Sequence, residues 1–170
     1  VKNAEKDGYK AAQLGFGTKK EKNLAKAQIG HFKGLGAFRY VREYRLGEKD
    51  AVPAVGDKFD MTVFKEGDIV AVSATSKGKG FQGTVRRHHF KGGSRTHGQK
   101  HSEREPGAIG GGARAGGRVA KGMRMSGRMG GDRITVKNLQ IVALDTEKGE
   151  LYIKGAVPGV KGGLVEVRGS

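Results

Sequence analysis

A glycine-rich motif at residues 78–83 is the first feature whose spacing could serve chemistry. Its sequence, GKGFQG, matches GxGxxG, in which glycines open a helix whose N-terminus meets a dinucleotide pyrophosphate. The residues that follow, TVRRHH at 84–89, show no helical pattern, and no βαβ unit surrounds them. We therefore expect backbone passing close to phosphate at three glycines, with two lysines alongside: Gly78, Gly80, Gly83, Lys77 and Lys79. A nucleotide-using enzyme is the alternative, although the phosphate-loop pattern GxxxxGK followed by Ser or Thr occurs nowhere.

Histidines and glutamates give two further candidate sites. His97 and His101 are four residues apart, a spacing that on a helix lets two imidazoles share a metal ion. Gly98 weakens such a helix and the chain has no cysteine, so we expect these histidines to hydrogen-bond and stack on nucleic acid. Glu103 and Glu105 would share one face of an extended chain, but no nucleophile with its base accompanies them. We expect them to pair with neighbouring arginines or face solvent, and we predict no catalytic residue, metal or cofactor.

Three methionines are interleaved with arginines in the second half of the chain. Met123, Met125 and Met129 would be core residues in an ordinary protein. Because Arg124 and Arg128 stand between them in a glycine-rich segment, we interpret the methionines as apolar contacts to bases and riboses. The arginines would then reach phosphates.

Positive charge dominates the composition. The 170 residues include 33 Lys and Arg against 17 Asp and Glu, a formal charge of +16. Twelve of these cations and only three acids fall between residues 86 and 133, so this segment alone carries +9. Such clustering indicates a polyanionic partner rather than a merely soluble basic protein. The side chains expected to bind nucleic acid are Lys77, Lys79, Arg86, Arg87, His88, His89, Lys91, Arg95, His97, Lys100, His101, Arg104, Arg114, Arg118, Lys121, Arg124, Arg128 and Arg133.

The same basic segment lacks the apolar residues needed to fold alone. It holds thirteen glycines and only six larger apolar residues, too few to offset the entropy of ordering 48 residues. We expect it to be mobile in the free protein and to order against its partner. Six of the eleven residues from 107 to 117 are glycine, and we expect close backbone approach to RNA at Gly110, Gly111 and Gly112. A tolerant flexible linker is the alternative.

The flanks of the basic segment show the patterns of short strands. We expect strands at residues 9–16, 69–74, 134–143, 151–153 and 164–167, and a helix-prone stretch at 20–27. Short strands joined by tight turns predict a mainly β fold, an antiparallel barrel or sandwich.

Two details of the strand pattern make sharper predictions. Phe59, Met61 and Val63 alternate with polar neighbours and predict a strand that forms a hairpin with residues 69–74. The apolar positions change phase between residues 134–136 and 139–143. A one-residue phase change predicts a β-bulge, which we place near Asn138.

Two features of the sequence concern where the protein is found in the cell: its hydropathy and its first residue. No apolar run approaches the roughly 18 residues that a membrane span needs, and none is longer than the four residues of IVAV at 69–72. We predict neither a membrane partner nor a small-molecule substrate. The chain starts at Val1 rather than Met, so we expect that N-terminal sequence is missing, and a targeting segment could have been lost with it.

The sequence TSKGKGFQGTVRR at 75–87 resembles large-subunit ribosomal protein three (the L-three family) of bacterial or organellar type. The resemblance continues in order through THG at 96–98, EPGAIG at 105–110, GRMG at 127–130, RITV at 133–136 and KGAVPG at 154–159. It departs from the family at the start, where a segment carrying a further strand is absent. Some bacterial relatives carry a methylated Gln after the Ile-Gly step; here that position is Gly111, so this modification is not expected.

The resemblance implies a translation-factor-like antiparallel β-barrel with a long, basic, Gly-rich and largely irregular extension. We expect the barrel domain at 1–76 and 134–170, with a short helical or irregular insert at about 20–56, and the extension at 77–133. The resemblance also implies a non-enzymatic component of the large ribosomal subunit, on cytoplasmic or organellar ribosomes. Its partners would be large-subunit ribosomal RNA and neighbouring ribosomal proteins, with a role in early assembly and an extension reaching toward the peptidyl-transferase region. A free nucleic-acid-binding factor such as a chaperone is the remaining alternative.

Overall fold

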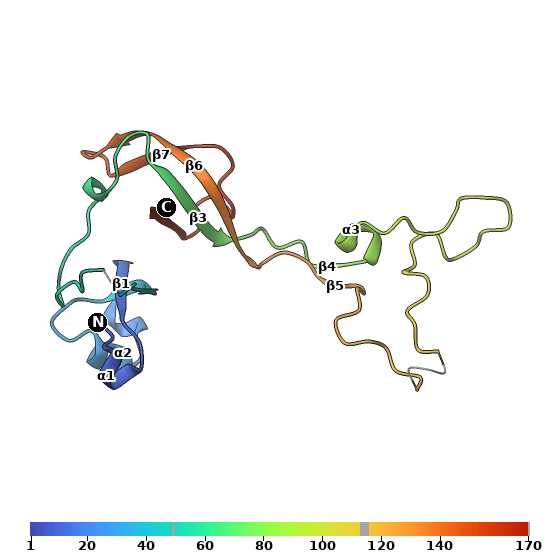
Figure 1. The fold of residues 1–170 in the computed structure, drawn as a ribbon, viewed down its shortest axis with the longest axis horizontal. Helices are drawn as coiled ribbons and strands as arrows, with labels where there is room; N and C mark the ends of the chain where they lie inside the picture. The colour runs from blue at the N-terminus through green and yellow to red at the C-terminus, as the bar shows by residue number, and fades with distance from the viewer. Residues whose placement is uncertain (49, 113–115, 170) are drawn as a thin grey trace. The chain divides into compact units, whose positions relative to one another are not determined.

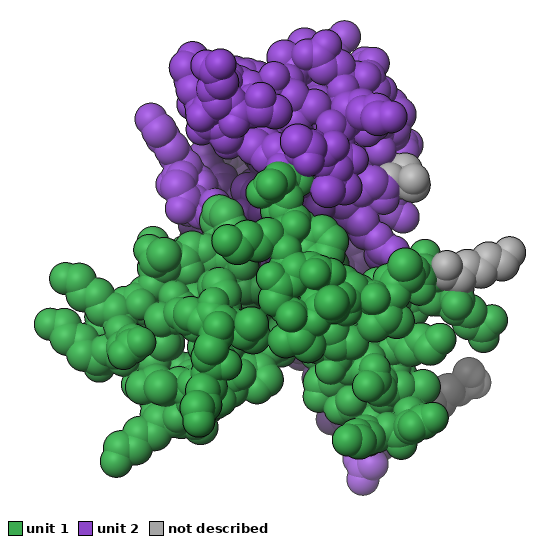
Figure 2. All heavy atoms as spheres, turned by 90° about the vertical axis from the view of Figure 1, so that its left-hand side faces the viewer, with its two compact units in different colours: residues 1–60 green, residues 61–170 purple. Residues whose placement is uncertain are grey.

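The chain consists of two compact units, and the computed structural model describes residues 1–48, 50–112 and 116–169. The units are Val1–Asp60 and Met61–Ser170, coloured separately in Figure 2. Antiparallel strands organise both, so the predicted mainly β class is confirmed. The described strands form three separate sheets, none of which closes into a barrel. The barrel implied by the resemblance therefore stays a prediction.

The first unit is built on a two-stranded sheet, in which β1 (Ala11–Thr18) pairs antiparallel with β2 (Phe38–Arg45) (Figure 1). A Cβ at Gly15 would lie 2.5 Å from Cγ of Phe38, so the missing side chain lets that ring pack on β1. The predicted strand at 9–16 is confirmed with a later start, while two shorter elements replace the helix expected at 20–27. The remaining elements of this unit are α1 (Ala4–Asp7), η1 (Glu21–Asn23) and α2 (Lys26–His31).

The second unit contains a four-stranded antiparallel sheet with the strand order β7–β6–β3–β8 (Figure 1). Its strands are β3 (Ile69–Thr75), β6 (Arg133–Asp145), β7 (Glu150–Lys154) and β8 (Val165–Gly169). The core of this sheet is formed by Val70, Val72, Leu139 and Ile141. These apolar side chains supply the hydrophobic stabilisation of the sheet, and the strands predicted in this part of the chain are confirmed.

The predicted bulge in β6 is confirmed. Val70 pairs with Leu139 and Val72 with Val136, so β6 uses one residue more than β3 over this interval. Asn138 lies there with φ of 59°, a left-handed conformation that Asn tolerates better than most residues. The extra residue moves the apolar side chains of β6 from one phase to the other, which keeps both Val136 and Leu139 against the core.

The predicted hairpin between residues 59–63 and 69–74 is wrong. Met61–Val63 form a 3₁₀ turn, η2, and Phe59 lies outside any strand. Both edges of β3 are already occupied, because Val72 pairs with Val136 of β6 on one side and with Val167 of β8 on the other. A third strand has no free edge to join, a constraint that local alternation of residues does not reveal.

Between β3 and β6 the chain makes a long excursion with little regular structure. It contains β4 (Phe81–Gln82), α3 (Thr84–His88) and β5 (Gly127–Arg128). The described residues between 89 and 126 belong to no helix or strand. The expectation that no helix follows the GxGxxG motif is wrong, since α3 begins directly after Gly83. Of the helices in the described chain, none is long and apolar enough to cross a membrane.

Candidate nucleic-acid interface

A paired ribbon, here called the stalk (residues 76–82 and 127–132), leads from the sheet into the excursion (Figure 1). The backbone N–H of Ser76 donates to the Asp132 carbonyl at 2.8 Å. Lys79 N–H donates to the Met129 carbonyl and Met129 N–H to the Gly80 carbonyl, both at 2.9 Å. β4 and β5 continue this pairing. The stalk therefore extends the β3–β6 pairing into the segment in which the positive charge is clustered.

Glycine is required inside the stalk at position 130. Gly130 has φ of +73°, and a Cβ there would overlap the Lys77 carbonyl oxygen. The three motif glycines differ from Gly130 in the space around them, because a Cβ at Gly78, Gly80 or Gly83 would meet no described atom within 4 Å. The described residues leave the space beside these glycines open. Close approach of phosphate to these three glycines stays a prediction.

Two residues of α3 hold the returning chain. Arg87 Nη1 donates to the Met125 carbonyl at 2.8 Å, and His88 Nε2 lies 3.1 Å from the same oxygen. We call this arrangement the Met125 contact. Both side chains are half-buried, whereas the neighbouring Arg86 is exposed. The structure thus shows the predicted nucleic-acid ligands Arg87 and His88 bound to the protein's own backbone.

The Met125 contact also explains why a five-residue helix forms here despite its β-branched start. Residues Thr84 and Val85 have modest helix propensity, and isolated helices this short are unstable in water. Tertiary hydrogen bonds to Met125 supply what local propensity lacks, and Thr84 is only 2% exposed. The helix ends at His89, which is left-handed with φ of 60°. No parallel strand follows α3 in the described chain, so the context of a dinucleotide site is absent there.

A smaller loop, residues 92–103, is closed by internal contacts. Gly93 N–H donates to the Glu103 carbonyl at 3.0 Å, and Arg95 Nε donates to the Glu103 carboxylate at 3.1 Å. A Cβ at Gly93 would lie 2.7 Å from the Ser102 carbonyl oxygen. Glu103 thus pairs with an arginine, as expected, though one eight residues away, while Glu105 is exposed.

The histidines whose spacing on a helix would let them share a metal ion have no helix to align them. His97 lies in a turn and His101 in a bend, and both are exposed. The described residues contain no group of three or more His, Cys, Asp or Glu that could hold a metal ion.

Most of the predicted cationic ligands are exposed and lack an ion pair with any described residue. Arg133 is different, because Nη1 and Nη2 donate to the two Glu166 carboxylate oxygens at 2.9 and 2.7 Å. Arg133 therefore joins β6 to β8, and Arg114 lies outside the described residues. The exposed cations without an ion pair in the described chain are Lys77, Lys79, Arg86, Lys91, Lys100, Arg104, Arg118, Lys121, Arg124 and Arg128. Their charge is available to a polyanion.

The glycine-rich stretch beyond the stalk requires glycine for its backbone conformation. Gly110 and Gly111 have φ of +81° and +93°, which side chains rarely adopt. A Cβ at Gly110 or Gly112 would meet no atom of the described residues within 4 Å. The conformation thus disfavours side chains at Gly110 and Gly111, and close approach of RNA to all three glycines stays a prediction.

The methionines of this region divide into two kinds. Met123 is 39% exposed, while Met125 and Met129 are half-buried within the protein. Arg124 places its guanidinium carbon 5.8 Å from the centre of the Phe90 ring. Contacts of these methionines to bases and riboses stay a prediction, with Met123 the most accessible.

The structure adds one candidate to the interface that the sequence interpretation left out. Phe81 is 76% exposed in β4, between the exposed Lys79 and the helix α3. The predicted ligands are all Lys, Arg, His or Gly residues, and Phe81 of the GKGFQG motif is not among them. An aromatic residue set among lysines and glycines is itself a signal of nucleic-acid binding.

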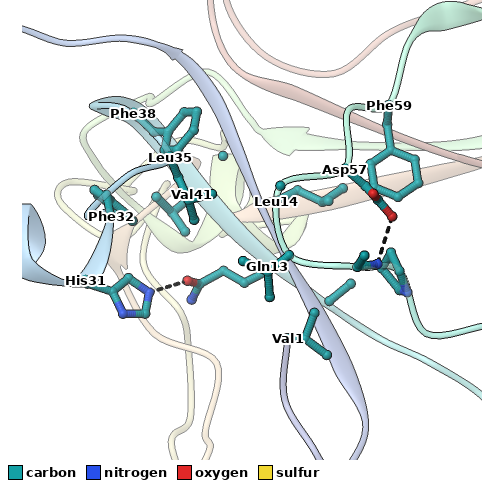
Figure 3. Close-up of a pocket in the computed structure, with 16 residues that line it drawn as sticks. Val1, Gln13, Leu14, His31, Phe32, Leu35, Phe38, Val41, Asp57 and Phe59 are labelled. Atoms are coloured by element: carbon teal, nitrogen blue, oxygen red, sulfur yellow. Dashed lines mark hydrogen bonds between the residues drawn. The ribbon is translucent and has the colours of Figure 1, made fainter.

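The first unit contains a hollow of about 190 Å³ whose lining is mainly apolar, unlike the basic interface (Figure 3). His31 and Gln13 form a hydrogen bond of 2.6 Å there, and Asp57 accepts from the Ala54 N–H at 2.7 Å. The remaining lining is mainly apolar, including Leu14, Phe32, Leu35, Phe38, Val41 and Phe59. Among the described residues that line the hollow there is no nucleophile with an activating base, so we assign it no catalytic role.

The shifted pKa values lie outside the interface and have simple causes. The Lys2 side chain donates to Asp7 at 2.8 Å, which lowers the pKa of Asp7 and raises that of Lys2. The hydrogen bond from Tyr9 to Glu43 raises the pKa of Tyr9, and that from Tyr152 to Glu150 raises the pKa of Tyr152. These pairs are local stabilising contacts.

Comparison with known proteins gives a consistent family. The family model described as ribosomal protein L3 matches residues 51–151. The large ribosomal subunit protein uL3 of Herpetosiphon aurantiacus is 47% identical over 168 residues, covering 98% of this chain and 78% of the relative. The protein of the same name from Chlorobium phaeobacteroides is 46% identical over 169 residues, covering 98% and 80%. That of Ectopseudomonas mendocina is also 46% identical over 169 residues, covering 98% and 79%.

Proposed function

The chain belongs to the ribosomal protein L3 family, and we propose that it binds ribosomal RNA as a structural component of the large ribosomal subunit. Its relatives carry the name of a large-subunit protein, and the family is structural, so the chain is not an enzyme. Its place is on the ribosome of the cytoplasm, in keeping with its bacterial relatives. An organellar ribosome would present the same kind of RNA.

The observation that carries RNA binding is unpaired positive charge on a segment without a core. Ten exposed cations of the stalk and the excursion lack ion pairs in the described chain, and the only buried described residue from 77 to 132 is Thr84. RNA phosphates supply both the counter-charge and the missing contacts. We therefore propose the extension at 77–133 as the RNA-binding part, and residues 1–76 with 134–170 as the supporting domain.

Membership of the family suggests three further features: a closed barrel, the path of the extension and a role in assembly. A barrel would form if further strands joined the open sheets, since β7 and β8 each have an unpaired edge in the described chain. The extension would pass through ribosomal RNA toward the peptidyl-transferase region, beside neighbouring ribosomal proteins. Such a buried path requires the RNA to fold around the protein, which is the reason to propose a role in early assembly.

Sedimentation of large subunits in high salt tests the proposal. A tagged copy of the chain should stay with the subunit through the wash, because an integral component is enclosed by RNA. Release by the wash would instead favour a free nucleic-acid-binding factor. Absence from the subunits at every salt concentration would contradict the proposal outright.

RNA affinity gives a second measurement on the isolated chain. The logarithm of the binding constant should fall linearly with the logarithm of salt concentration, with a slope of several units. Replacing Lys77 and Lys79 by Gln should lower that slope by about one to two, because each lysine that meets a phosphate releases a counterion. An affinity independent of salt would exclude phosphate-dominated binding.

A further inference from the structure

The two faces of the β4–β5 ribbon differ in what covers them. Phe81 pairs with Arg128, and Gln82 pairs with Gly127. Directly paired residues of antiparallel strands share a face, and successive residues alternate between faces. One face therefore carries Gln82 and Gly127, and the other carries Phe81 and Arg128.

Helix α3 covers the face that carries Gln82 and Gly127. Arg86 Nη1 donates to Gln82 Oε1 at 3.3 Å. Arg87 Nη1 occupies the space beside Gly127, where a Cβ would come within 2.7 Å of it. This face is used by the protein itself.

The face that carries Phe81 is uncovered. Phe81 is 76% exposed, the largest exposed fraction of any large hydrophobic side chain in the described parts of the chain. The nearby Gly78, Gly80 and Gly83 add open space, because a Cβ at any of them would meet no described atom within 4 Å. Exposing an aromatic ring forgoes the stabilisation that burial would give, so the fold gains nothing from Phe81 in this place.

The surroundings of Phe81 select the chemistry of its partner. Residues 76–89 and 124–133 contain seven Lys and Arg and one acid, Asp132. On the same face as Phe81, Arg128 Nη2 donates to the Gly131 carbonyl at 3.4 Å, which holds an exposed guanidinium beside the ribbon. A planar ring in a positive field fits a nucleobase attached to a phosphate backbone.

We propose that Phe81 is a stacking platform for an unpaired nucleobase, and that Arg128 meets the phosphate of the same or the adjacent nucleotide. The ligand class at the stalk is then single-stranded or flipped-out RNA, because a base inside a duplex keeps both faces stacked on its neighbours. This inference rests on the proposed RNA-binding function and assigns to the stalk a contact that needs a base. The remaining cations of the extension need only phosphates.

Binding of two single-stranded probes to the full chain tests the stacking platform. One probe is an oligouridine about twelve nucleotides long, within the range of lengths that single-stranded binding sites cover, and the other has the same ribose-phosphate backbone with every base removed. Phe81→Leu keeps an apolar side chain and removes the ring, so affinity for oligouridine should fall about tenfold, the weaker part of the range for stacking on aromatics. Affinity for the abasic probe should stay within about twofold, since the phosphate contacts are unchanged. Phe81→Tyr should restore binding of oligouridine.

The chain offers a matched control in Phe16, which is 69% exposed in β1 of the first unit. Phe16→Leu should leave both affinities unchanged, and thermal unfolding of both leucine variants should match the parent. An equal loss with Phe16→Leu would overturn the assignment to the stalk. So would unchanged oligouridine binding by Phe81→Leu, or an equal loss on both probes.

The two probes also separate this inference from the function on which it rests. Suppose that replacing Lys77 and Lys79 by Gln weakens binding of both probes, while Phe81→Leu has no effect. The proposed RNA-binding function would then stand, and only the stacking platform would be overturned. If neither change affects either probe, the proposed function fails as well. If Phe81→Leu binds RNA like the parent but enters large subunits poorly, a neighbouring protein covers the ring and the nucleobase proposal is wrong.

Discussion

The four-stranded sheet and the extension that leaves it are ordered by different forces. The sheet buries Val70, Val72 and Ile141 to 1% exposure or less. The extension has no comparable cluster in its described residues, and where it leaves the sheet it is held mainly by the hydrogen bonds of the stalk and the Met125 contact. A region with a core can persist without a partner, whereas hydrogen bonds exchanged with water contribute only about 1 kcal/mol each. We therefore expect the sheet and the extension to respond independently to substitution.

The largest expected effect is on the sheet. Ile141→Ala removes a side chain that is 1% exposed and should lower the free energy of unfolding by about 3 kcal/mol, within the range for large-to-small core substitutions. Val142→Ala is the matched control, because the Val142 side chain, next to Ile141 in sequence, is 56% exposed and its loss should lower the free energy of unfolding only slightly. Chemical denaturation followed by circular dichroism measures both. Equal destabilisation by the two changes would show that the register of β6 is wrong.

The next effect concerns the glycines beyond the stalk. Valine at both Gly110 and Gly111 is strained by their positive φ, because β-branched residues are outliers in that conformation. The sheet should unfold as in the parent, since these glycines contribute nothing to its core. If the backbone must pass close to RNA, affinity for ribosomal RNA and incorporation into large subunits should both fall by about tenfold. A tenfold loss corresponds to a lost contact of about 1.4 kcal/mol.

Gly112 provides the control for those glycines. Its φ is not positive in this way, and no described residue lies within 4 Å of its Cβ position, so Gly112→Ala tests the side chain without the backbone strain. A loss of incorporation with Gly112→Ala would support close passage against RNA. If the double valine variant assembles and functions like the parent, the flexible-linker interpretation replaces close passage.

A smaller effect should separate the roles of two adjacent arginines in α3. Arg87→Gln removes the 2.8 Å bond to Met125, so limited proteolysis should cut sooner near residues 123–128 while the salt dependence of RNA binding keeps its slope. Arg86→Gln should do the reverse, lowering the slope by about one and leaving the cleavage pattern unchanged, because Arg86 is exposed. A reduced slope for Arg87→Gln would return that residue to the phosphate-binding set.

The smallest expected effect is at the ion pair between β6 and β8. Arg133→Gln should lower stability by no more than about 1 kcal/mol, because the Arg133 side chain is 58% exposed and solvent screens the pair. The loss should shrink in high salt, and RNA affinity should stay within about twofold. A large loss of affinity would place Arg133 at the RNA instead of the sheet.

Composition and local pattern were enough to predict several features of this chain. Short apolar segments and the turns between them located β3, β6, β7 and β8, while the interaction with a polyanion expected from the clustered charge between residues 86 and 133 stays a prediction. The phase change around Asn138 predicted the bulge, because the pleat fixes which side chains share a face. Each of these features follows from neighbours along the chain.

Which segments meet depends instead on contacts between distant parts of the chain. β3 pairs with β6 across an excursion of more than fifty residues, which left no edge for the expected hairpin with residues 59–63. The α3 helix exists because Arg87 and His88 reach the Met125 carbonyl, 38 and 37 residues away in sequence. The same distant contact turned two expected RNA ligands inward and left Phe81 on the open face of the ribbon. Hydrogen bonds between residues so far apart depend on how the whole chain closes, and no local pattern of residue types encodes that closure.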